Sequence, residues 1–220
     1  MFDKLAQCSG FQMYVNPNDD NVSQELFAGK CYPKGVWEPE SSLLVRENLR
    51  SGDVFVDCGA NIGYYTCLAA SLGAKVIAFE PSPTHFGYLN ENVRLNNFTN
   101  VITLPFALWN EQKQLCINEP KSGNVADTKV GEPISGLPAT IQAYTLDQIL
   151  YPNSVDFIKT DCQGSDYRVL MGANRLIRES VRPMKFLLER GFGIDLQIKE
   201  LGLSIIKSIG SEQNVFCSRN

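Results

Sequence analysis

Apolar and polar positions along this chain form blocks that predict strands alternating with helices. Residues 54–58, VFVDC, are a continuous apolar run that is typical of a strand buried on both faces. Apolar side chains then recur at helical spacing from residue 62 until Gly73, which predicts a helix ending there. A second strand is predicted at 75–80 and a second helix at 83–96. This alternation indicates a parallel sheet covered by helices.

The alternation continues through most of the remaining sequence. Further strands are predicted at 101–108, 114–119, 155–162 and 185–189, a helix follows from the Gly-Ser-Asp turn to residue 177, and a closing hairpin is predicted at 203–209 and 214–218. Ser82 is expected to cap the helix that begins at Pro83, and Ser41 or Ser42 to start a short helix that ends at Gly52.

Two segments have weaker periodicity. Residues 120–139 hold three glycines and three prolines, which predicts either a loop on the substrate side of the domain or an exposed connection without a role. Residues 1–40 are expected to cover one side of the sheet within a single domain that spans residues 1–220.

Composition narrows the class of protein. The chain has 220 residues, of which 44% are hydrophobic and 20% charged, so it can bury one core. Its net charge is −4 and it has no basic run, which disfavours nucleic acid as a partner. No segment has the roughly 20 apolar residues of a membrane span, and the N-terminus lacks a secretory pattern. A cytoplasmic protein is therefore expected.

Cysteines are numerous but show no pattern of a disulfide framework or a metal site. The seven cysteines include no C-x-x-C pair, and three fall in segments predicted to be buried. They are expected to act as small apolar side chains in a reducing compartment. No cluster of His, Cys and carboxylates has metal-ligand spacing, so no metal is predicted.

The turn DCGANIG after the first strand is the main candidate for ligand binding. Gly59 permits a sharp turn from strand to helix, and Gly63 is expected to let the backbone approach a ligand. Glu80 ends the next strand, 21 residues after Gly59. As an exposed acid at a strand end, it can accept two hydrogen bonds from a ribose diol.

Two classes of cofactor fit such a turn. A dinucleotide favours a third glycine, G-x-G-x-x-G, to free backbone N–H groups for the pyrophosphate, but this chain has Asn61 at the middle position. S-adenosylmethionine has a ribose and no phosphate, and Asp57, Asn61 and the turn backbone can contact its amino acid end. The residues favour S-adenosylmethionine, while a nicotinamide-dependent oxidoreductase and a turn that binds no ligand are the alternatives.

Three motifs, VFVDCGANIGYYT, KVIAFEPSPTHFGYLNENVRLNN and VDFIKTDCQGSDYRVLMGA, together resemble the FkbM family of S-adenosylmethionine-dependent methyltransferases. The resemblance extends from about residue 14 to the closing hairpin. It implies an α/β fold of class I methyltransferases, a Rossmann-like, doubly wound, mostly parallel sheet of seven strands with a C-terminal antiparallel hairpin. It also implies methyl transfer to a hydroxyl, often on a sugar or a polyketide-like molecule.

One position departs from the family pattern. The family usually has D-x-E-G where this chain has Asp161, Cys162, Gln163 and Gly164, so a second carboxylate is missing. Asp161 is the candidate general base, with capping of the following turn as its alternative role. Lys159 either orients a substrate oxygen or pairs with Asp161.

The remaining candidates surround the expected cofactor. Glu189 and Arg190 either line the pocket or form a surface ion pair, and His85 is expected to face solvent from its helix. Pro81 and Ser82, with Phe106, Ala107 and Leu108, are expected to hold the adenine, and Trp37 with Glu38 to close over the methionine end. The predicted cofactor-binding set is Asp57, Gly59, Ala60, Asn61, Gly63, Glu80, Pro81, Ser82, Phe106, Ala107, Leu108 and Glu38.

The sequence therefore predicts an O-methyltransferase that uses S-adenosylmethionine and acts on a hydroxyl of a small molecule or glycan. The alternative is a cofactor-binding protein with lost or altered catalysis, because Gln163 replaces the family acid.

Overall fold

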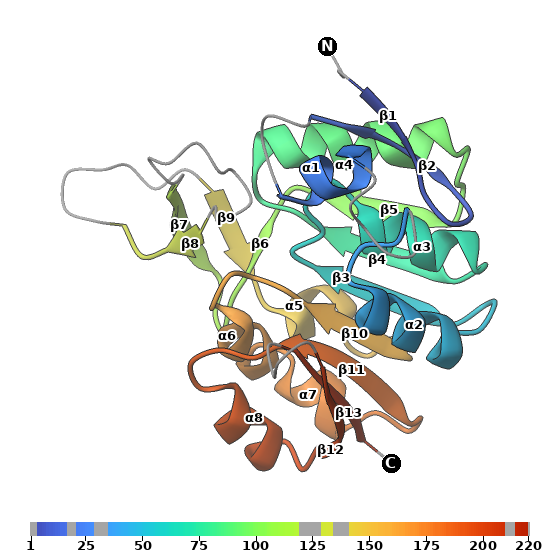
Figure 1. Ribbon diagram of the computed structural model, residues 1–220. Coiled ribbons are helices and arrows are strands. Elements are labelled where there is room, and N and C mark those ends of the chain that lie inside the picture. Colours follow the sequence, from blue (N-terminus) through green and yellow to red (C-terminus); the bar gives the residue numbers. More distant parts are fainter. Residues whose placement is uncertain are drawn as a thin grey trace.

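A computed structural model describes residues 4–16, 21–28, 35–118, 129–133, 141–209 and 214–219. Its central feature is a seven-stranded sheet in the order β12-β13-β11-β10-β3-β4-β5 (Figure 1). The strands are β3 (Val54–Cys58), β4 (Lys75–Phe79), β5 (Val101–Leu104), β10 (Phe157–Thr160), β11 (Met184–Glu189), β12 (Ser204–Ile209) and β13 (Asn214–Arg219).

The strand directions confirm the predicted fold class. Strands β11, β10, β3, β4 and β5 are parallel to one another, whereas β13 runs antiparallel to β11 and β12 antiparallel to β13. From β3 the chain proceeds to β4 and β5 on one side, and later to β10 and β11 on the other. The order therefore reverses between β3 and β10, and in open parallel sheets such a reversal is where ligands bind.

Successive side chains of the central strands enter two separate cores, as strand geometry requires, whereas the edge strand β12 is mostly exposed. Phe55 packs with one cluster and Val56 with the other, and both side chains are fully buried. The first cluster includes residues of α2 (Pro39–Asn48), α3 (Tyr64–Ser71) and α4 (Pro83–Leu95), and the second includes residues of α5 (Leu146–Leu150), α6 (Asp166–Met171), α7 (Asn174–Arg178) and α8 (Ile194–Glu200). The sheet is thus covered on both faces, which explains its continuous apolar strands.

The N-terminal segment packs against α4. It comprises the hairpin β1 (Lys4–Gln7) and β2 (Gln12–Val15), followed by α1 (Asn21–Ala28). The side-chain amide of Asn92 accepts from the Tyr14 N–H at 2.6 Å and donates to its carbonyl at 3.1 Å. Asn96 makes the same two contacts with Gln12. One asparagine of α4 and the one at its C-cap thus dock the hairpin through its backbone.

A smaller sheet, in the order β6-β9-β7-β8, projects to one side in Figure 1. It consists of β6 (Ala107–Leu108), β7 (Lys113–Asn118), β8 (Lys129–Gly131) and β9 (Ile141–Tyr144). The predicted strand 101–108 is therefore wrong as one element: it divides into β5 and β6, with Pro105, which has no N–H to donate, between them. Of the predicted loop 120–139, only residues 129–133 lie in the described part.

Two helix predictions differ from the structure, and one helix was missed. Helix α2 begins at Pro39, and Ser42 is buried with its hydroxyl donating to the Trp37 carbonyl, so neither serine starts the helix. The helix predicted to reach residue 177 is divided at Gly172, where a β-carbon would lie 2.2 Å from the Trp109 carbonyl oxygen. Helix α8 was not predicted, although Ile194 and Ile198 follow helical spacing.

Two further expectations can be compared with the described residues. Of the six cysteines in the described ranges, five (8, 58, 67, 116 and 217) are buried, as expected for small apolar side chains, and Cys162 is half-buried; Cys31 lies outside those ranges. Within those ranges, no helix is long and apolar enough to cross a membrane.

Candidate active site

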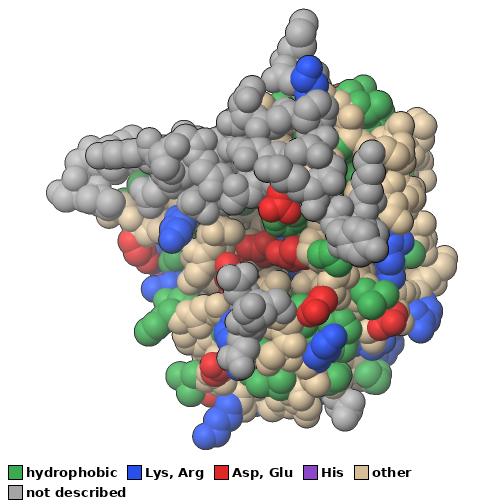
Figure 2. All heavy atoms as spheres, in the orientation of Figure 1, with side chains coloured by type: hydrophobic (Ala, Val, Ile, Leu, Met, Phe, Trp, Pro, Cys, Tyr) green, Lys and Arg blue, Asp and Glu red, His purple; other side chains and the backbone are tan. Residues whose placement is uncertain are grey.

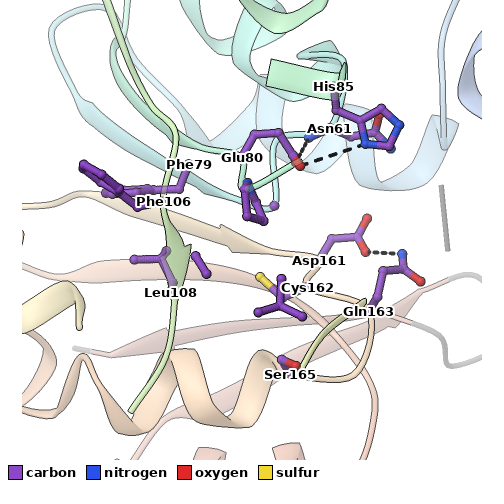
Figure 3. A pocket seen from close by; sticks show the side chains of 14 residues that line it. Asn61, Phe79, Glu80, His85, Phe106, Leu108, Asp161, Cys162, Gln163 and Ser165 are labelled. Atoms are coloured by element: carbon purple, nitrogen blue, oxygen red, sulfur yellow. Dashed lines mark hydrogen bonds and ion pairs between the residues drawn. The ribbon is translucent and has the colours of Figure 1, made fainter. Parts of the chain in front are cut away.

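Two neighbouring cavities lie at the carboxyl ends of β3, β4 and β10. The first is lined by Gly59, Asn61, Phe79, Glu80, Pro81, His85, Phe106, Ala107, Leu108, Val130, Asp161, Cys162, Gln163 and Ser165 (Figure 3). The second is lined by Val22, Trp37, Glu38, Gly59, Ala60, Asn61, Ile62, Tyr64, Tyr65, Lys159, Asp161, Gln163, Glu189, Arg190 and Asn214. Four residues, Gly59, Asn61, Asp161 and Gln163, line both, so the cavities adjoin.

The turn that joins β3 to α3 has no backbone donor left for a ligand. All five N–H groups of residues 59–63 already donate: two to the carbonyl of Phe79, one to the carboxylate of Glu80, one to the side chain of Asn61 and one to the carbonyl of Ala60. A pyrophosphate needs free N–H groups at such a turn. The turn therefore does not fit a dinucleotide, and its N–H groups are not available to an amino acid end either.

The two glycines of the turn are required by close packing within the protein. A β-carbon on Gly59, whose φ is +77°, would lie 2.1 Å from the carbonyl oxygen of Asp161. One on Gly63, at φ +94°, would lie 2.7 Å from Cδ1 of Leu89 in α4. Gly63 lines neither cavity. The sequence predicted that Gly63 lets a ligand approach the backbone. In the structure, the glycine is instead needed because α3 and α4 pack closely there.

Glu80 is buried and holds two backbone N–H groups, whereas the sequence predicted an exposed acid at a strand end. It is 6% exposed, and its two carboxylate oxygens accept the N–H groups of Asn61 and Ser82, each at 2.8 Å. His85, expected in solvent, is also buried, with Nδ1 3.9 Å from Oε1 of Glu80 (Figure 3). Burial raises the pKa of Glu80 to about 7, although the two N–H groups lower it.

The side of the first cavity away from Glu80 is apolar. Phe79, Phe106 and Leu108 line it, and the Phe106 ring packs edge-on against Tyr144 at a centroid distance of 4.9 Å. These side chains, with Pro81 and Ala107, form a slot that fits an aromatic base.

Ser82 does not belong to this slot. It is fully buried, and its hydroxyl caps α4 by accepting from the His85 N–H at 3.5 Å. The capping prediction for Ser82 is therefore confirmed, but the structure does not place its side chain in the cavity.

Lys159 stands between two carboxylates. Its Nζ lies 3.7 Å from Oδ1 of Asp57 and 3.5 Å from Oδ2 of Asp161. Burial alone would lower the pKa of Lys159, but the carboxylates of Asp161, Asp57 and Glu38 raise it above the ordinary value. Lys159 therefore stays protonated, and it pairs with acids rather than acting as a base.

Asp57 is sealed beneath the turn. It is fully buried and accepts a hydrogen bond from the Thr66 hydroxyl at 2.7 Å, besides its contact with Lys159. It lines neither cavity. Direct contact of Asp57 with the amino acid end of a cofactor does not fit this position, because its carboxylate is used to hold α3 and Lys159.

Asp161 follows β10 directly and faces both cavities. Its Oδ1 accepts from Nε2 of Gln163 at 3.1 Å (Figure 3). Its Oδ2 faces Lys159. The alternative role of Asp161, capping the next turn, is filled by Asp166, whose Oδ1 accepts from the Cys162 N–H at 3.1 Å. Asp161 is thus available to a ligand.

Acidic side chains gather in a hollow near the middle of the face in Figure 2. Three acids, Glu38, Asp161 and Glu189, line the second cavity. Oε2 of Glu38 accepts from the Tyr65 hydroxyl at 2.7 Å, and burial raises the pKa of Glu38. Across the described ranges, no group of three or more His, Cys, Asp and Glu side chains is arranged to hold a metal ion.

Sequence reasoning missed several side chains of the two cavities: Phe79, Val130, Cys162 and Ser165 in the first, and Tyr65 in the second. Phe79 could have been found because it immediately precedes Glu80 at the end of a strand. Val130 could not, because it belongs to a segment without periodicity.

Comparison with known proteins decides the family. The model of the methyltransferase FkbM domain matches residues 57–208. The chain belongs to the FkbM methyltransferase family. A relative named Methyltransferase 1, from Beauveria bassiana, is 24% identical over 200 residues, covering 78% of this chain and 76% of the relative. The hexuronic acid methyltransferase AglP of Haloferax volcanii is 29% identical over 144 residues, covering 64% of this chain and 58% of AglP.

A solved structure supports the fold of this FkbM family member. The crystal structure of methyltransferase FkbM from Methylobacillus flagellatus KT superposes with a TM-score of 0.54 at 17% identity. It matches 91% of this chain, which spans 54% of that protein. The central sheet is thus that of a class I methyltransferase, and methyltransferase is the activity that the family indicates.

Proposed function

We propose that this FkbM family member transfers a methyl group from S-adenosylmethionine to a hydroxyl of a small molecule or glycan. The observation that carries the proposal is the junction of the two cavities at Gly59, Asn61, Asp161 and Gln163. A donor that fills the first cavity ends beside a carboxylate that faces the second. That arrangement brings the two reactants of a methyl transfer together.

The residues of the first cavity fit the nonreacting parts of S-adenosylmethionine. The adenine would lie in the slot of Phe79, Phe106 and Leu108, and the ribose hydroxyls would donate to Glu80. The methionine end would extend toward the second cavity, where the Glu38 carboxylate suits an ammonium group. The donor, when bound, supplies an electrophilic methyl group on a sulfonium. The absence of free N–H groups in the turn suits this phosphate-free cofactor better than NAD.

The reaction also requires removal of the hydroxyl proton, because a neutral hydroxyl is a weak nucleophile. Asp161 is the proposed base. Nζ of Lys159 lies 3.5 Å from one of its oxygens, and the Gln163 amide holds the other. Lys159 thus acts on Asp161 and not directly on the acceptor.

Two observations bear on the acceptor class. AglP, which is named a hexuronic acid methyltransferase, supports a sugar acceptor. The acids Glu38, Asp161 and Glu189 in the second cavity disfavour a nucleic acid, whose phosphates they would repel. A neutral polyhydroxyl compound suits this lining.

The second candidate function is cofactor binding with lost or altered catalysis, which Gln163 in place of the family acid favours. The hydrogen bond from Gln163 to Asp161 keeps the base oriented, which supports a working site.

Calorimetry with S-adenosylmethionine, S-adenosylhomocysteine and NAD tests the cofactor, and a library of hydroxyl compounds tests the reaction. We expect binding of the first two ligands, no competition by NAD, and an O-methylated product. Failure of both sulfur ligands to bind would refute the cofactor assignment. Binding without any methylated product would support the second candidate.

A further inference from the structure

Three aromatic side chains, Trp37, Tyr64 and Tyr65, line the second cavity. Tyr64 and Tyr65 are only 3% and 4% exposed, and their rings pack edge-on at a centroid distance of 5.3 Å. The face of the Tyr65 ring also carries Nζ of Lys159, which lies 5.1 Å from the ring centroid. Trp37, in contrast, is half-buried. Of the three rings, Trp37 is therefore the one that can present an aromatic surface to a ligand.

The backbone around Trp37 is held in place by several contacts. Its carbonyl accepts from the Ser42 hydroxyl, which lies 3.1 Å from the Tyr64 hydroxyl. The next residue, Glu38, has a φ of 41°, which is uncommon for a residue other than glycine. Its carbonyl accepts from the Ser42 N–H at 2.9 Å, and its carboxylate accepts from the Tyr65 hydroxyl at 2.7 Å. Such a strained conformation persists only where its surroundings fix it, so Trp37 is a rigid part of the cavity wall.

The same cavity also receives charged side chains from the ends of two strands. Asp161 follows β10, and Arg190 follows β11. A ligand in the second cavity therefore meets an aromatic surface as well as charged groups that form hydrogen bonds. A saturated ring with hydroxyl substituents matches both, because its face consists of C–H groups and its hydroxyls lie at the edge. An open-chain polyol has no such fixed apolar face.

We propose that the acceptor stacks the C–H face of a saturated ring on Trp37 and thereby presents its hydroxyl to Asp161. Trp37 binds and orients the acceptor and takes no part in the transfer of the proton or the methyl group. This inference rests on the proposed function, which an open-chain acceptor would satisfy equally well. The alternative role of Trp37, covering the methionine end of the cofactor, is an outcome of the tests below. Trp37 lines the second cavity and not the first.

Tryptophan fluorescence tests the stacking directly. The chain has two tryptophans, and Trp109 is 3% exposed, with the Arg168 guanidinium 4.5 Å from its ring centroid. A ligand that stacks in the second cavity should therefore change the emission of Trp37 alone. The probes are the methyl glycopyranosides of glucose, galactose and mannose, with the corresponding open-chain hexitols, added to protein saturated with S-adenosylhomocysteine. We expect a saturable change with at least one glycopyranoside and none with the hexitols.

Variants of the two tryptophans assign the response and connect it to the reaction. Trp37→Phe leaves Trp109 as the sole reporter and should abolish the fluorescence change, whereas Trp109→Phe should retain it. Trp37→Leu removes the aromatic face, so KM for the responding glycopyranoside should rise about tenfold with little change in kcat. Trp37→Phe keeps a ring and should restore most of the wild-type KM. Calorimetry should show the same affinity for S-adenosylhomocysteine in all variants, which also establishes that they are folded.

The outcomes separate the inference from the function on which it rests. No fluorescence change with any glycopyranoside, an equal change with the hexitols, or an unaltered KM in Trp37→Leu would overturn the role of Trp37 and leave the methyltransferase assignment intact. Weaker binding of S-adenosylhomocysteine to Trp37→Leu would instead place Trp37 over the cofactor and would also overturn the inference. If S-adenosylhomocysteine does not bind the wild-type protein, the proposed function itself fails.

Discussion

Glu80 at the end of β4 accepts a hydrogen bond of 2.8 Å from the backbone N–H of Asn61, in the turn that follows β3. The acid proposed to bind the ribose thus also holds the turn against the neighbouring strand. Its other oxygen accepts from Ser82, which caps α4. One carboxylate therefore connects a strand end, a turn and a helix start, and cofactor binding and local stability depend on the same side chain.

Replacement of Glu80 by alanine should lower both cofactor affinity and stability. The N–H groups of Asn61 and Ser82 would lose their buried acceptor, at a cost of about 2–4 kcal/mol in the free energy of unfolding. Urea denaturation and calorimetry with S-adenosylhomocysteine measure the two effects. Glu47→Ala, at an exposed position, is the matched control. A fully stable Glu80→Ala protein would show that these two hydrogen bonds contribute little to the free energy of unfolding.

Stability should fall as pH rises toward 8. The pKa values of Glu80, about 7, and Glu189, about 8, lie above the usual 4.5. Between pH 4.5 and these raised values, the folded state therefore binds more protons than the unfolded state. This stabilisation is complete below pH 4.5 and is lost as pH rises through 7 to 8, by on the order of 3 kcal/mol per group.

Denaturant unfolding at pH 5.5, 7 and 8.5 measures that slope. In Glu189→Gln one titrating group is absent, although Asp161, Asp166 and Lys159 remain around it, so the decline should be smaller. An equal decline in the variant would contradict the raised pKa of Glu189.

Gly59→Ala should be strongly destabilising. The new β-carbon would meet the Asp161 carbonyl oxygen at 2.1 Å, and φ at this position is +77°. A loss of about 3 kcal/mol or more is expected. Gly87, inside α4, has open space around its α-carbon, and Gly87→Ala should gain about 0.5–1 kcal/mol from helix propensity. Thermal melts of the Gly59→Ala and Gly87→Ala variants measure both effects. Similar melting temperatures for the two variants would refute the close packing of the turn.

Asp161→Asn should slow the reaction without weakening the cofactor. Loss of a general base typically costs about 10²–10⁴-fold in rate, whereas Glu80 and the apolar slot are unchanged. Single-turnover rates and S-adenosylhomocysteine affinity separate the two effects. An unchanged rate would exclude Asp161 as the base.

Gln163→Glu places the family acid in this chain and decides between the two candidate functions. The change removes the N–H that donates to Oδ1 of Asp161 and adds a negative charge beside it. Without this hydrogen bond, and with a like charge next to it, Asp161 should be less well oriented toward the acceptor, so the rate should fall several-fold. An increase in rate across the pH range would instead mean that Gln163 impairs catalysis.

The sequence predicted the central sheet because buried parallel strands produce continuous apolar runs such as residues 54–58. It also predicted that Glu80 and Asp161 each follow the end of a strand of the site, since strand ends can be read from the same runs; the two strands, β4 and β10, lie on either side of β3. The small sheet was only partly predicted: β7 was predicted, β9 was missed, and β6 and β8 are very short.

The errors concern what each side chain contacts. Sequence placed Asp57 and Gly63 at the ligand, but Asp57 is covered by Thr66 and Lys159, and Gly63 faces Leu89. These partners come from residues 9 to 102 positions away, a distance at which local patterns carry no information. Likewise, burial of Glu80 and His85 results from packing of the turn and α4 together.

The central claim is that the methyl donor occupies the first cavity with its sulfur toward Asp161. A crystal structure with S-adenosylhomocysteine tests it most directly. We predict adenine between Phe79 and Leu108, ribose hydroxyls on Glu80, and sulfur facing the junction of the two cavities. A ligand bound elsewhere, or in the first cavity with its sulfur turned away from Asp161, would contradict the account.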